Sequence, residues 1–153
     1  MADNNSSLTP GQVPVLDEQI CFALYSASRA ITARYRDLLE PLGLTYPQYL
    51  VLLVLWENEP VTVSHLGDRL HLDSGTLSPL LRRMETAGLL ARIRSPHDER
   101  SVQVSLTESG SALRHHARGI TDRICAATGI DLPDLQQLRD QVAQLGEHVR
   151  ASP

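Results

Sequence analysis

The sequence lacks lysine, has few aromatic residues and contains no long hydrophobic run. All 14 basic residues are arginines, and the 18 acidic residues give a formal net charge of −4. That balance argues against a polycation that binds nucleic acid indiscriminately, although local charge decides specific binding to DNA. No apolar stretch approaches the roughly 20 residues that a membrane-spanning helix needs, and the first residues lack the basic-then-apolar pattern of a secretion signal. We therefore expect a cytoplasmic protein with no membrane partner.

Cysteine is also scarce: the sequence contains only Cys21 and Cys125, which form no Cys-x-x-Cys pair. In a cytoplasmic chain this spacing disfavours both a structural disulfide and a zinc ribbon, and we expect no cofactor. The length of 153 residues suits a single domain with a core of its own. Residues 1–13 are mostly small and polar, so we expect them to form a disordered tail.

The centre of the chain has the pattern of two short helices separated by a tight turn. Thr62 can cap a first helix over 63–70, because its hydroxyl can accept a hydrogen bond from a free N–H group of the first turn. Asp73 or Ser74 can cap a second helix over 75–86 in the same way. This arrangement predicts a helix-turn-helix.

Two alternating runs follow Gly88, which ends the second helix because glycine adopts a left-handed conformation at little cost. Residues 89–94 place Ala91 and Ile93 on one face and arginines on the other, and residues 102–106 alternate in the same way. Each run predicts a half-buried strand, and the polar segment between them predicts a hairpin. Helix-turn-helix and hairpin together form a winged helix, whose usual role is to bind duplex DNA. The expected fold class is mainly α with a small β-ribbon.

The second helix of this unit supplies most of the candidate DNA contacts. Its leucines and methionine are spaced to face inward, whereas its small residues and arginines face outward or lie in the first turn. Small residues let a helix approach the groove, and arginine can contact guanine edges, phosphates or, from a wing, the minor groove. The candidate DNA-binding residues are Ser74, Gly75, Thr76, Ser78, Pro79, Arg82, Arg83, Arg94, Asp98 and Arg100. The alternative is that the arginines only form a solvated face.

Long amphipathic helices flank this winged unit, which spans 45–106. Residues 14–44 predict one helix before it, and residues 107–150 predict two helices after it, separated at Gly129. Their apolar positions recur every three or four residues, and a small winged unit cannot cover them all. We therefore expect two chains to pair through these helices as a homodimer, which would present recognition helices about 34 Å apart to a palindromic operator. A compact monomeric bundle is the alternative.

Cys21 is expected one to two turns into the first helix, close behind Asp17 and Glu18. A helix start favours a thiolate, whereas nearby carboxylates disfavour it, so the local sequence does not settle the reactivity of this thiol. Tyr25 follows four residues later and lies over the same face. Taken alone, a helical cysteine is more often a small core residue.

Several motifs resemble the MarR family of winged-helix regulators. Asp98-Glu-Arg100 is similar to the wing of that family, and Leu106-Thr-Glu-Ser-Gly110 is similar to its post-wing helix start. Four further segments resemble one branch of this family, the organic-hydroperoxide sensors called OhrR. They are Cys21-Phe-Ala-Leu-Tyr25, Leu44-Thr-Tyr-Pro-Gln-Tyr-Leu-Val-Leu-Leu53, Trp56-Glu57 and Leu72-Asp-Ser-Gly-Thr-Leu-Ser-Pro-Leu-Leu81. The resemblance covers nearly the whole chain, apart from the first dozen residues and the last few.

The resemblance implies a transcriptional repressor that senses organic hydroperoxides. Cys21 matches the cysteine whose thiolate attacks the peroxide and becomes a sulfenic acid. Tyr35 and Tyr46 match two tyrosines that hydrogen-bond this thiolate from the other chain, and Tyr25 matches a further tyrosine near the pocket. Cys125 resembles the resolving thiol, which forms an intersubunit disulfide with Cys21 and thereby releases the DNA; otherwise it is a buried spacer in its helix.

Three other functions compete with this one. A MarR-type repressor could instead release DNA when a phenolic or aromatic-acid ligand binds beside Tyr35 and Tyr46, with inert cysteines. A thiol peroxidase would need a second catalytic dyad, which the sequence does not show, so we expect no enzyme. A metal sensor built on His115, His116 and Cys125 is disfavoured, because adjacent histidines point to different faces of a helix.

Overall fold

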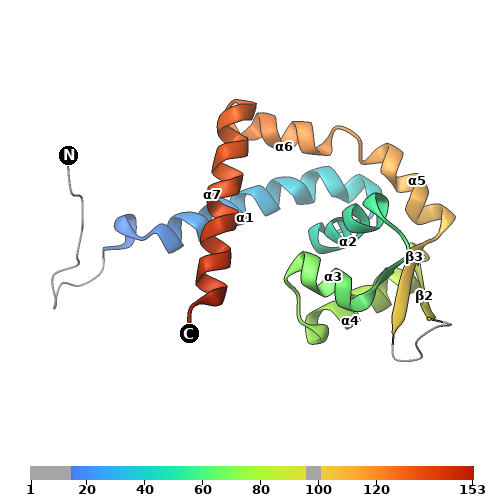
Figure 1. The fold of residues 1–153 in the computed structure, drawn as a ribbon. Coiled ribbons are helices and arrows are strands. Elements are labelled where there is room, and N and C mark those ends of the chain that lie inside the picture. The colour runs from blue at the N-terminus through green and yellow to red at the C-terminus, as the bar shows by residue number, and fades with distance from the viewer. Residues whose placement is uncertain (1–14, 96–100) are drawn as a thin grey trace.

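The computed structural model describes residues 15–95 and 101–153, most of which are helical (Figure 1). The helices are α1 (Ile20–Leu39), α2 (Tyr46–Glu57), α3 (Val63–Leu70), α4 (Ser74–Thr86), α5 (Glu108–His116), α6 (Ile120–Thr128) and α7 (Leu132–Ala151), with short 3₁₀ segments η1 (Leu16–Glu18) and η2 (Glu40–Leu42). Strands β1 (Val61–Thr62), β2 (Leu90–Arg94) and β3 (Val102–Leu106) form an antiparallel sheet in the order β1-β3-β2. In the described ranges, no single helix is long and apolar enough to cross a membrane; only residues 20–42 and 46–57, taken together across a bend, meet that test by length and composition.

The first helix of the helix-turn-helix has the predicted bounds, and the second begins one residue earlier than predicted, at Ser74, and ends as predicted. The Thr62 side chain accepts a hydrogen bond from the His65 backbone N–H at 3.1 Å, which caps α3. At the start of α4, the Asp73 carboxylate accepts one from the Thr76 backbone N–H at 2.8 Å, so the aspartate is the cap. Gly88 follows α4 with a φ of 71°, the left-handed conformation that favours glycine. Local capping chemistry therefore decides these boundaries.

The ribbon forms as predicted, but β2 turns the opposite face inward. Leu90 is buried and Arg92 is half-buried, whereas Ile93, expected on the apolar face, is 61% exposed. Arg92 lies opposite the fully buried Val104 in the β2–β3 pairing, and directly opposite residues share one face of a sheet. The arginine can occupy this inner position because Glu85 on α4 neutralises it. A short strand β1, which the sequence did not predict, adds a third strand beside β3.

The helix expected from Thr107 to Gly129 is broken in the structure. It divides into α5 and α6 around Gly119, which has a φ of 81° and no neighbouring atom within 4 Å of where a Cβ would lie. Ala117 and Ile120 are buried on either side of the break. The apolar spacing therefore continues across the break, and the spacing alone does not reveal it.

Helix α2 lies at the centre of the core, and α5 is held against it. The largest fully buried side chains are Tyr49, Leu39, Leu52, Leu55, Leu66, Leu77, Leu81, Met84, Leu90, Val51 and Val104. The Trp56 indole N–H donates to the Gly110 carbonyl oxygen at 3.0 Å, which joins α2 to α5. A Cβ at Gly110 would clash with the Leu89 carbonyl oxygen, so only glycine allows this approach. Helix α5 is thus fixed against α2 and against the residue that precedes β2.

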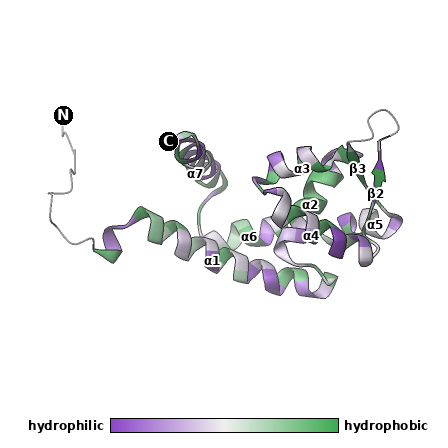
Figure 2. Cartoon of the chain, turned by 90° about the horizontal axis from the view of Figure 1, so that it is seen from below, coloured by the Kyte–Doolittle hydropathy of each residue, from purple (hydrophilic) through white to green (hydrophobic). Residues whose placement is uncertain are grey.

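Two helices leave apolar side chains uncovered. Along α1 and α7, the exposed large hydrophobic residues are Ile20, Phe22, Tyr25, Ile31, Leu132, Leu138, Val142, Leu145 and Val149. Both views show α7 clear of the winged unit and α1 extending beyond it (Figures 1 and 2). Exposed apolar stripes of this length usually mark an interface. No part of the chain from 15 to 95 or from 101 to 153 covers these faces.

Candidate DNA-binding surface and thiol site

Helix α4 presents the expected polar face. The apolar side chains predicted to face inward are at most 4% exposed: Leu77, Leu80, Leu81 and Met84. The small residues and the arginine pair of the outward face are exposed, except that Ser78 is half-buried. Arg94 is exposed at the end of β2, where the wing begins. Asp98 and Arg100 lie outside the described residues, so their predicted roles stay predictions.

An ion pair joins this recognition helix to the wing. The Glu85 carboxylate on α4 accepts hydrogen bonds from Arg92 on β2, at 3.0 Å from Nε, 2.7 Å from Nη2 and 3.2 Å from the backbone N–H. These bonds from Arg92 lower the pKa of Glu85, so the carboxylate stays charged at neutral pH. Both guanidinium N–H groups donate to Oε2 and the backbone N–H donates to Oε1, so the carboxylate holds both the side chain and the backbone of Arg92 and sets the wing relative to the helix. The sequence analysis missed it because the two residues come from different elements.

The tyrosines singled out by the resemblance lie together. The rings of Tyr35 on α1 and Tyr46 on α2 have centroids 4.4 Å apart, and Tyr49 lies 5.8 Å from the first ring. Burial, followed by the neighbouring Tyr46, Tyr49 and Cys125, raises the pKa of Tyr35 to about 12. Burial likewise raises the pKa of Tyr46. Both phenols therefore keep their protons at physiological pH and remain hydrogen-bond donors.

Cys125 lies in the neighbourhood of Tyr35, one of these two tyrosines. It is half-buried on α6, which packs against α1, and it is close enough to contribute to the raised pKa of Tyr35. The structure thus brings together three of the predicted site residues, namely both tyrosines and the second cysteine. The sequence places them far apart, so only the resemblance predicted that they would meet.

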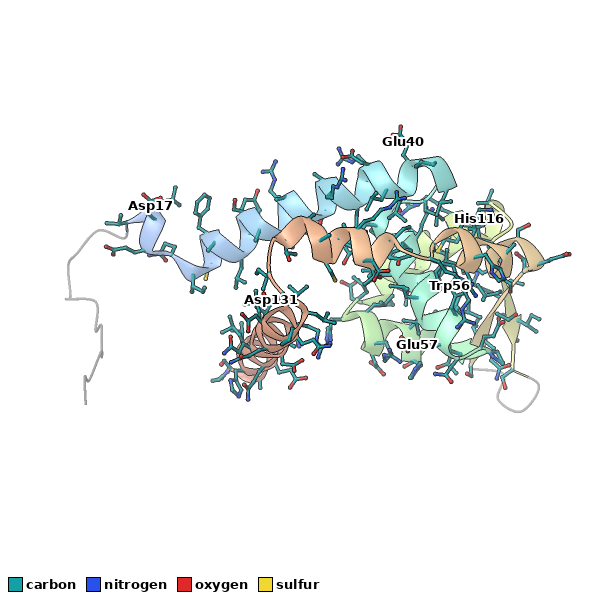
Figure 3. The ribbon with its side chains drawn as sticks, turned by 90° about the horizontal axis from the view of Figure 1, so that it is seen from above. Asp17, Glu40, Trp56, Glu57, His116 and Asp131 are labelled. Atoms are coloured by element: carbon teal, nitrogen blue, oxygen red, sulfur yellow. The ribbon has the colours of Figure 1, made fainter. Side chains whose placement is uncertain are left out.

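Cys21 lies elsewhere in the chain. It is exposed and is the second residue of α1, so it sits in the first turn of the helix and not one to two turns inside it. Helix α1 begins only at Ile20, because η1 occupies the residues before it. Tyr35 comes 14 residues later in the same helix, a distance of roughly 21 Å at 1.5 Å per residue. In Figure 3, Asp17 marks this end of α1, far from Trp56 in the core.

The two cysteines of one chain therefore cannot react with each other in this conformation. A disulfide needs Cα atoms within about 6 Å, and Cys125 lies beside Tyr35, near the other end of α1. Tyr25, the third predicted tyrosine, is on the exposed surface of α1 near Cys21 and is not part of the half-buried Tyr35–Tyr46 pair. Its hydroxyl accepts a hydrogen bond from Arg29.

An apolar recess lies between α1 and α6, one helical turn from Tyr35. It has a volume of about 230 Å³ and is lined by Ala30, Ile31, Arg34, Ile124, Ala127 and Thr128. The sequence analysis did not find it, because its walls come from helices that are distant in the chain. The Tyr35 and Tyr46 rings next to it pack directly against each other, tilted by 33°.

No metal site is found among residues 15–95 and 101–153: no group of three histidine, cysteine or acidic side chains could hold an ion. His115 and His116 are both exposed on α5. The His116 ring makes a hydrogen bond with the Ala112 carbonyl oxygen at 3.3 Å. These histidines are therefore surface residues of the helix.

Sequence comparison places this arrangement among known regulators. Residues 44–102 match the MarR family. The chain is 49% identical over 132 residues to the organic hydroperoxide resistance transcriptional regulator of Bacillus subtilis, and the match covers 86% of this chain and 90% of that protein.

Solved structures agree with this result. Reduced AbfR bound to DNA is 33% identical, with a TM-score of 0.73 and coverage of 88% of this chain and 94% of that chain. Disulfide-formed AbfR is 34% identical, with a TM-score of 0.59 and coverage of 85% and 91%. AbfR is a protein of Staphylococcus epidermidis. The predicted winged-helix fold is confirmed, and the relatives are regulators of transcription and not enzymes.

Proposed function

Because this chain belongs to the MarR family of DNA-binding transcriptional regulators, we propose that it is a homodimeric repressor that releases its operator when an organic hydroperoxide oxidises Cys21. The similarity to the Bacillus subtilis organic hydroperoxide resistance regulator supports this choice of oxidant. The observation that carries the proposal is the separation within one chain: the Tyr35–Tyr46 pair and Cys125 lie together, roughly 21 Å from Cys21. DNA as the partner implies a cytoplasmic site of action.

Pairing with a second copy of the chain would bring Cys21 to these groups. We assign residues 14–44 and 107–150 to dimerisation and residues 45–106 to DNA binding. A twofold pairing covers the exposed apolar stripes of α1 and α7. It also carries the start of α1 from one chain to the tyrosine pair of the other. Each site then takes Cys21 from one chain and Tyr35, Tyr46 and Cys125 from its partner.

The chemistry follows from these groups. Two neutral phenols donate hydrogen bonds to the Cys21 thiolate and stabilise its charge, which the carboxylates before α1 do not. The thiolate attacks the terminal oxygen of the hydroperoxide and the O–O bond breaks; the alkoxide takes a proton and leaves as an alcohol. The sulfur is oxidised to a sulfenic acid and the peroxide is reduced. The apolar recess beside Tyr35 and the exposed Phe22 suit an alkyl or aryl peroxide better than hydrogen peroxide.

Cys125 then serves as the resolving thiol. It attacks the sulfenic acid of the other chain, an S–S bond forms and water leaves. This closure pulls α6 and the start of α1 together, and α5 transmits the movement because Trp56 and Gly110 join it to the winged unit. The recognition helices then lose the spacing of about 34 Å that successive major grooves require. The higher TM-score with DNA-bound reduced AbfR than with disulfide-formed AbfR supports assigning the present conformation to the DNA-binding state.

Band-shift experiments test the proposal. The reduced protein first selects a duplex from a random library, and the complex is then treated with cumene hydroperoxide. We expect wild type to release the DNA, Cys21→Ser to remain bound, and a reductant to restore wild-type binding. On a non-reducing gel, wild type forms a crosslinked dimer and the matched Cys125→Ser variant does not. Release of Cys21→Ser to the wild-type extent would falsify peroxide sensing by this thiol.

The same assay distinguishes peroxide sensing from the alternative, in which a small-molecule ligand releases the DNA. An aromatic acid such as salicylate, added without oxidant, should leave both wild type and Cys21→Ser bound. Release of both proteins by the acid alone would favour a small-molecule regulator.

A further inference from the structure

Three side chains form a row along the exposed start of α1. Cys21, Tyr25 and Arg29 are spaced by four residues, which places them on one face of the helix. The Arg29 Nη1 donates a hydrogen bond to the Tyr25 hydroxyl at 3.0 Å. Its guanidinium carbon also lies 5.5 Å from the centroid of the tyrosine ring. The arginine therefore holds both the ring and the hydroxyl of this tyrosine.

The direction of these side chains matters. Side chains of a helix lean toward its N-terminus, so each one covers the turn before its own Cα. Arg29 reaches back over Tyr25 in this way, as the hydrogen bond shows. By the same rule, Tyr25 reaches back over the turn that contains Cys21. The row thus points toward the thiol.

Hydrogen-bonding chemistry then selects the role of the tyrosine. A guanidinium has only donors, so it occupies a lone pair of the phenol oxygen and leaves the O–H hydrogen free for another acceptor. On this row the next group toward the N-terminus is Cys21, whose thiolate is an acceptor. A charged donor also polarises the hydroxyl that accepts from it, which makes that hydroxyl a better donor in turn.

We propose that Arg29 is a positioning residue, which orients Tyr25 as a further hydrogen-bond donor to the Cys21 thiolate. The proposal deepens the proposed function and rests on it. The ionisable side chains that precede Cys21 most closely in the sequence are Asp17 and Glu18 on η1, whose charges oppose a thiolate; in the proposed dimer the tyrosine pair of the second copy also faces it. Arg29 supplies the positive charge that this end of the helix otherwise lacks.

The test measures the thiol directly, without peroxide. Reduced full-length Cys125→Ser protein is alkylated with iodoacetamide over a range of pH, and the midpoint for Cys21 is compared between variants. Arg29→Gln should shift that midpoint to higher pH and slow alkylation at neutral pH by about threefold to tenfold, with one pH unit equivalent to tenfold. Tyr25→Phe should do the same, and adding Arg29→Gln to it should change nothing more. Arg29→Lys, which keeps the charge and a donor, should restore part of the rate.

Arg114→Gln is the matched control, because it removes an exposed arginine from α5, outside the proposed thiol site. It should leave the profile unchanged. An unchanged profile in Arg29→Gln, or an equal shift in Arg114→Gln, overturns the role of Arg29. If Arg29→Gln still shifts the alkylation midpoint in full when Tyr25 is replaced by phenylalanine, the arginine does not act through the Tyr25 hydroxyl and the proposal is wrong. Failure of peroxide to release DNA from wild type instead contradicts the proposed function, and the alkylation profile is read independently of that result.

Discussion

Replacing Gly110 by alanine tests how closely α5 packs on the winged unit. A Cβ at this position would overlap the Leu89 carbonyl oxygen and lie 3.1 Å from Leu106 Cδ2. The carbonyl cannot move aside freely, because it accepts a hydrogen bond from the Thr107 backbone N–H at 3.2 Å. Accommodating the methyl group therefore moves α5 away from the ribbon and loosens its hydrogen bond with Trp56.

The magnitude follows from two opposing effects. Overpacking of this kind costs about 1–3 kcal/mol, whereas alanine in place of glycine in a helix gains up to about 1 kcal/mol. Because the overlap is with a backbone atom, the upper part of the overpacking range applies, about 2–3 kcal/mol, and the net loss at Gly110 is roughly 1–2 kcal/mol. At about 2–4 °C per kcal/mol for a chain of this size, the melting temperature should fall by roughly 2–8 °C.

Gly146→Ala in α7 is the matched control. A Cβ there meets only the flexible end of the Arg150 side chain, at 3.2 Å. The variant therefore keeps the stabilisation that alanine gives a helix, and it should melt at a higher temperature than wild type. Thermal unfolding of both variants, followed by circular dichroism on reduced full-length protein, measures the difference. If Gly110→Ala melts at or above the wild-type temperature, the close approach between α5 and the Leu89 carbonyl is not as described.

Three further predictions concern the wing, the thiol site and the start of α5. The Glu85→Gln variant should bind operator about tenfold more weakly than wild type. Because the pKa of Glu85 is lowered in the folded protein, the ion pair stabilises wild type fully above pH 4.5, the ordinary glutamate pKa, and this stabilisation is lost as the pH falls through the lowered pKa. The melting temperatures of the two proteins should therefore differ at neutral pH and converge in acid. Tyr35→Phe and Tyr46→Phe should each slow peroxide-induced DNA release about tenfold or more in stopped-flow fluorescence, since a hydrogen bond to a charged group is lost; equal rates would refute this. Thr107→Ala should lower the free energy of unfolding by roughly 1–3 kcal/mol in urea titrations, because the hydroxyl both caps α5 and donates to the Gly88 carbonyl.

Features set by local chemistry could be predicted from the sequence. The caps at Thr62 and Asp73 and the left-handed Gly88 depend on residues within one turn of the boundary, and the structure has all three. The order of elements in the winged unit followed from these boundaries.

Features that depend on contacts between distant segments could not be predicted in this way. The inner position of Arg92 needs Glu85 from another element, so alternation alone assigned Ile93 to the wrong face. The break at Gly119 interrupts a continuous apolar spacing, because buried residues continue on both sides of it. The gathering of the tyrosines and Cys125 came from the resemblance and from no local pattern.

The central claim is that the thiol of one chain lies against the phenols of the other. A crystal structure of the reduced dimer measures this directly, as the distances from Cys21 Sγ to the hydroxyl oxygens of Tyr35 and Tyr46 across the interface. The account predicts both distances at about 3.0–3.5 Å, with the sulfur and oxygens in hydrogen-bonding geometry. A Cys21 sulfur that faces solvent in the dimer, more than about 6 Å from both hydroxyls, would contradict it.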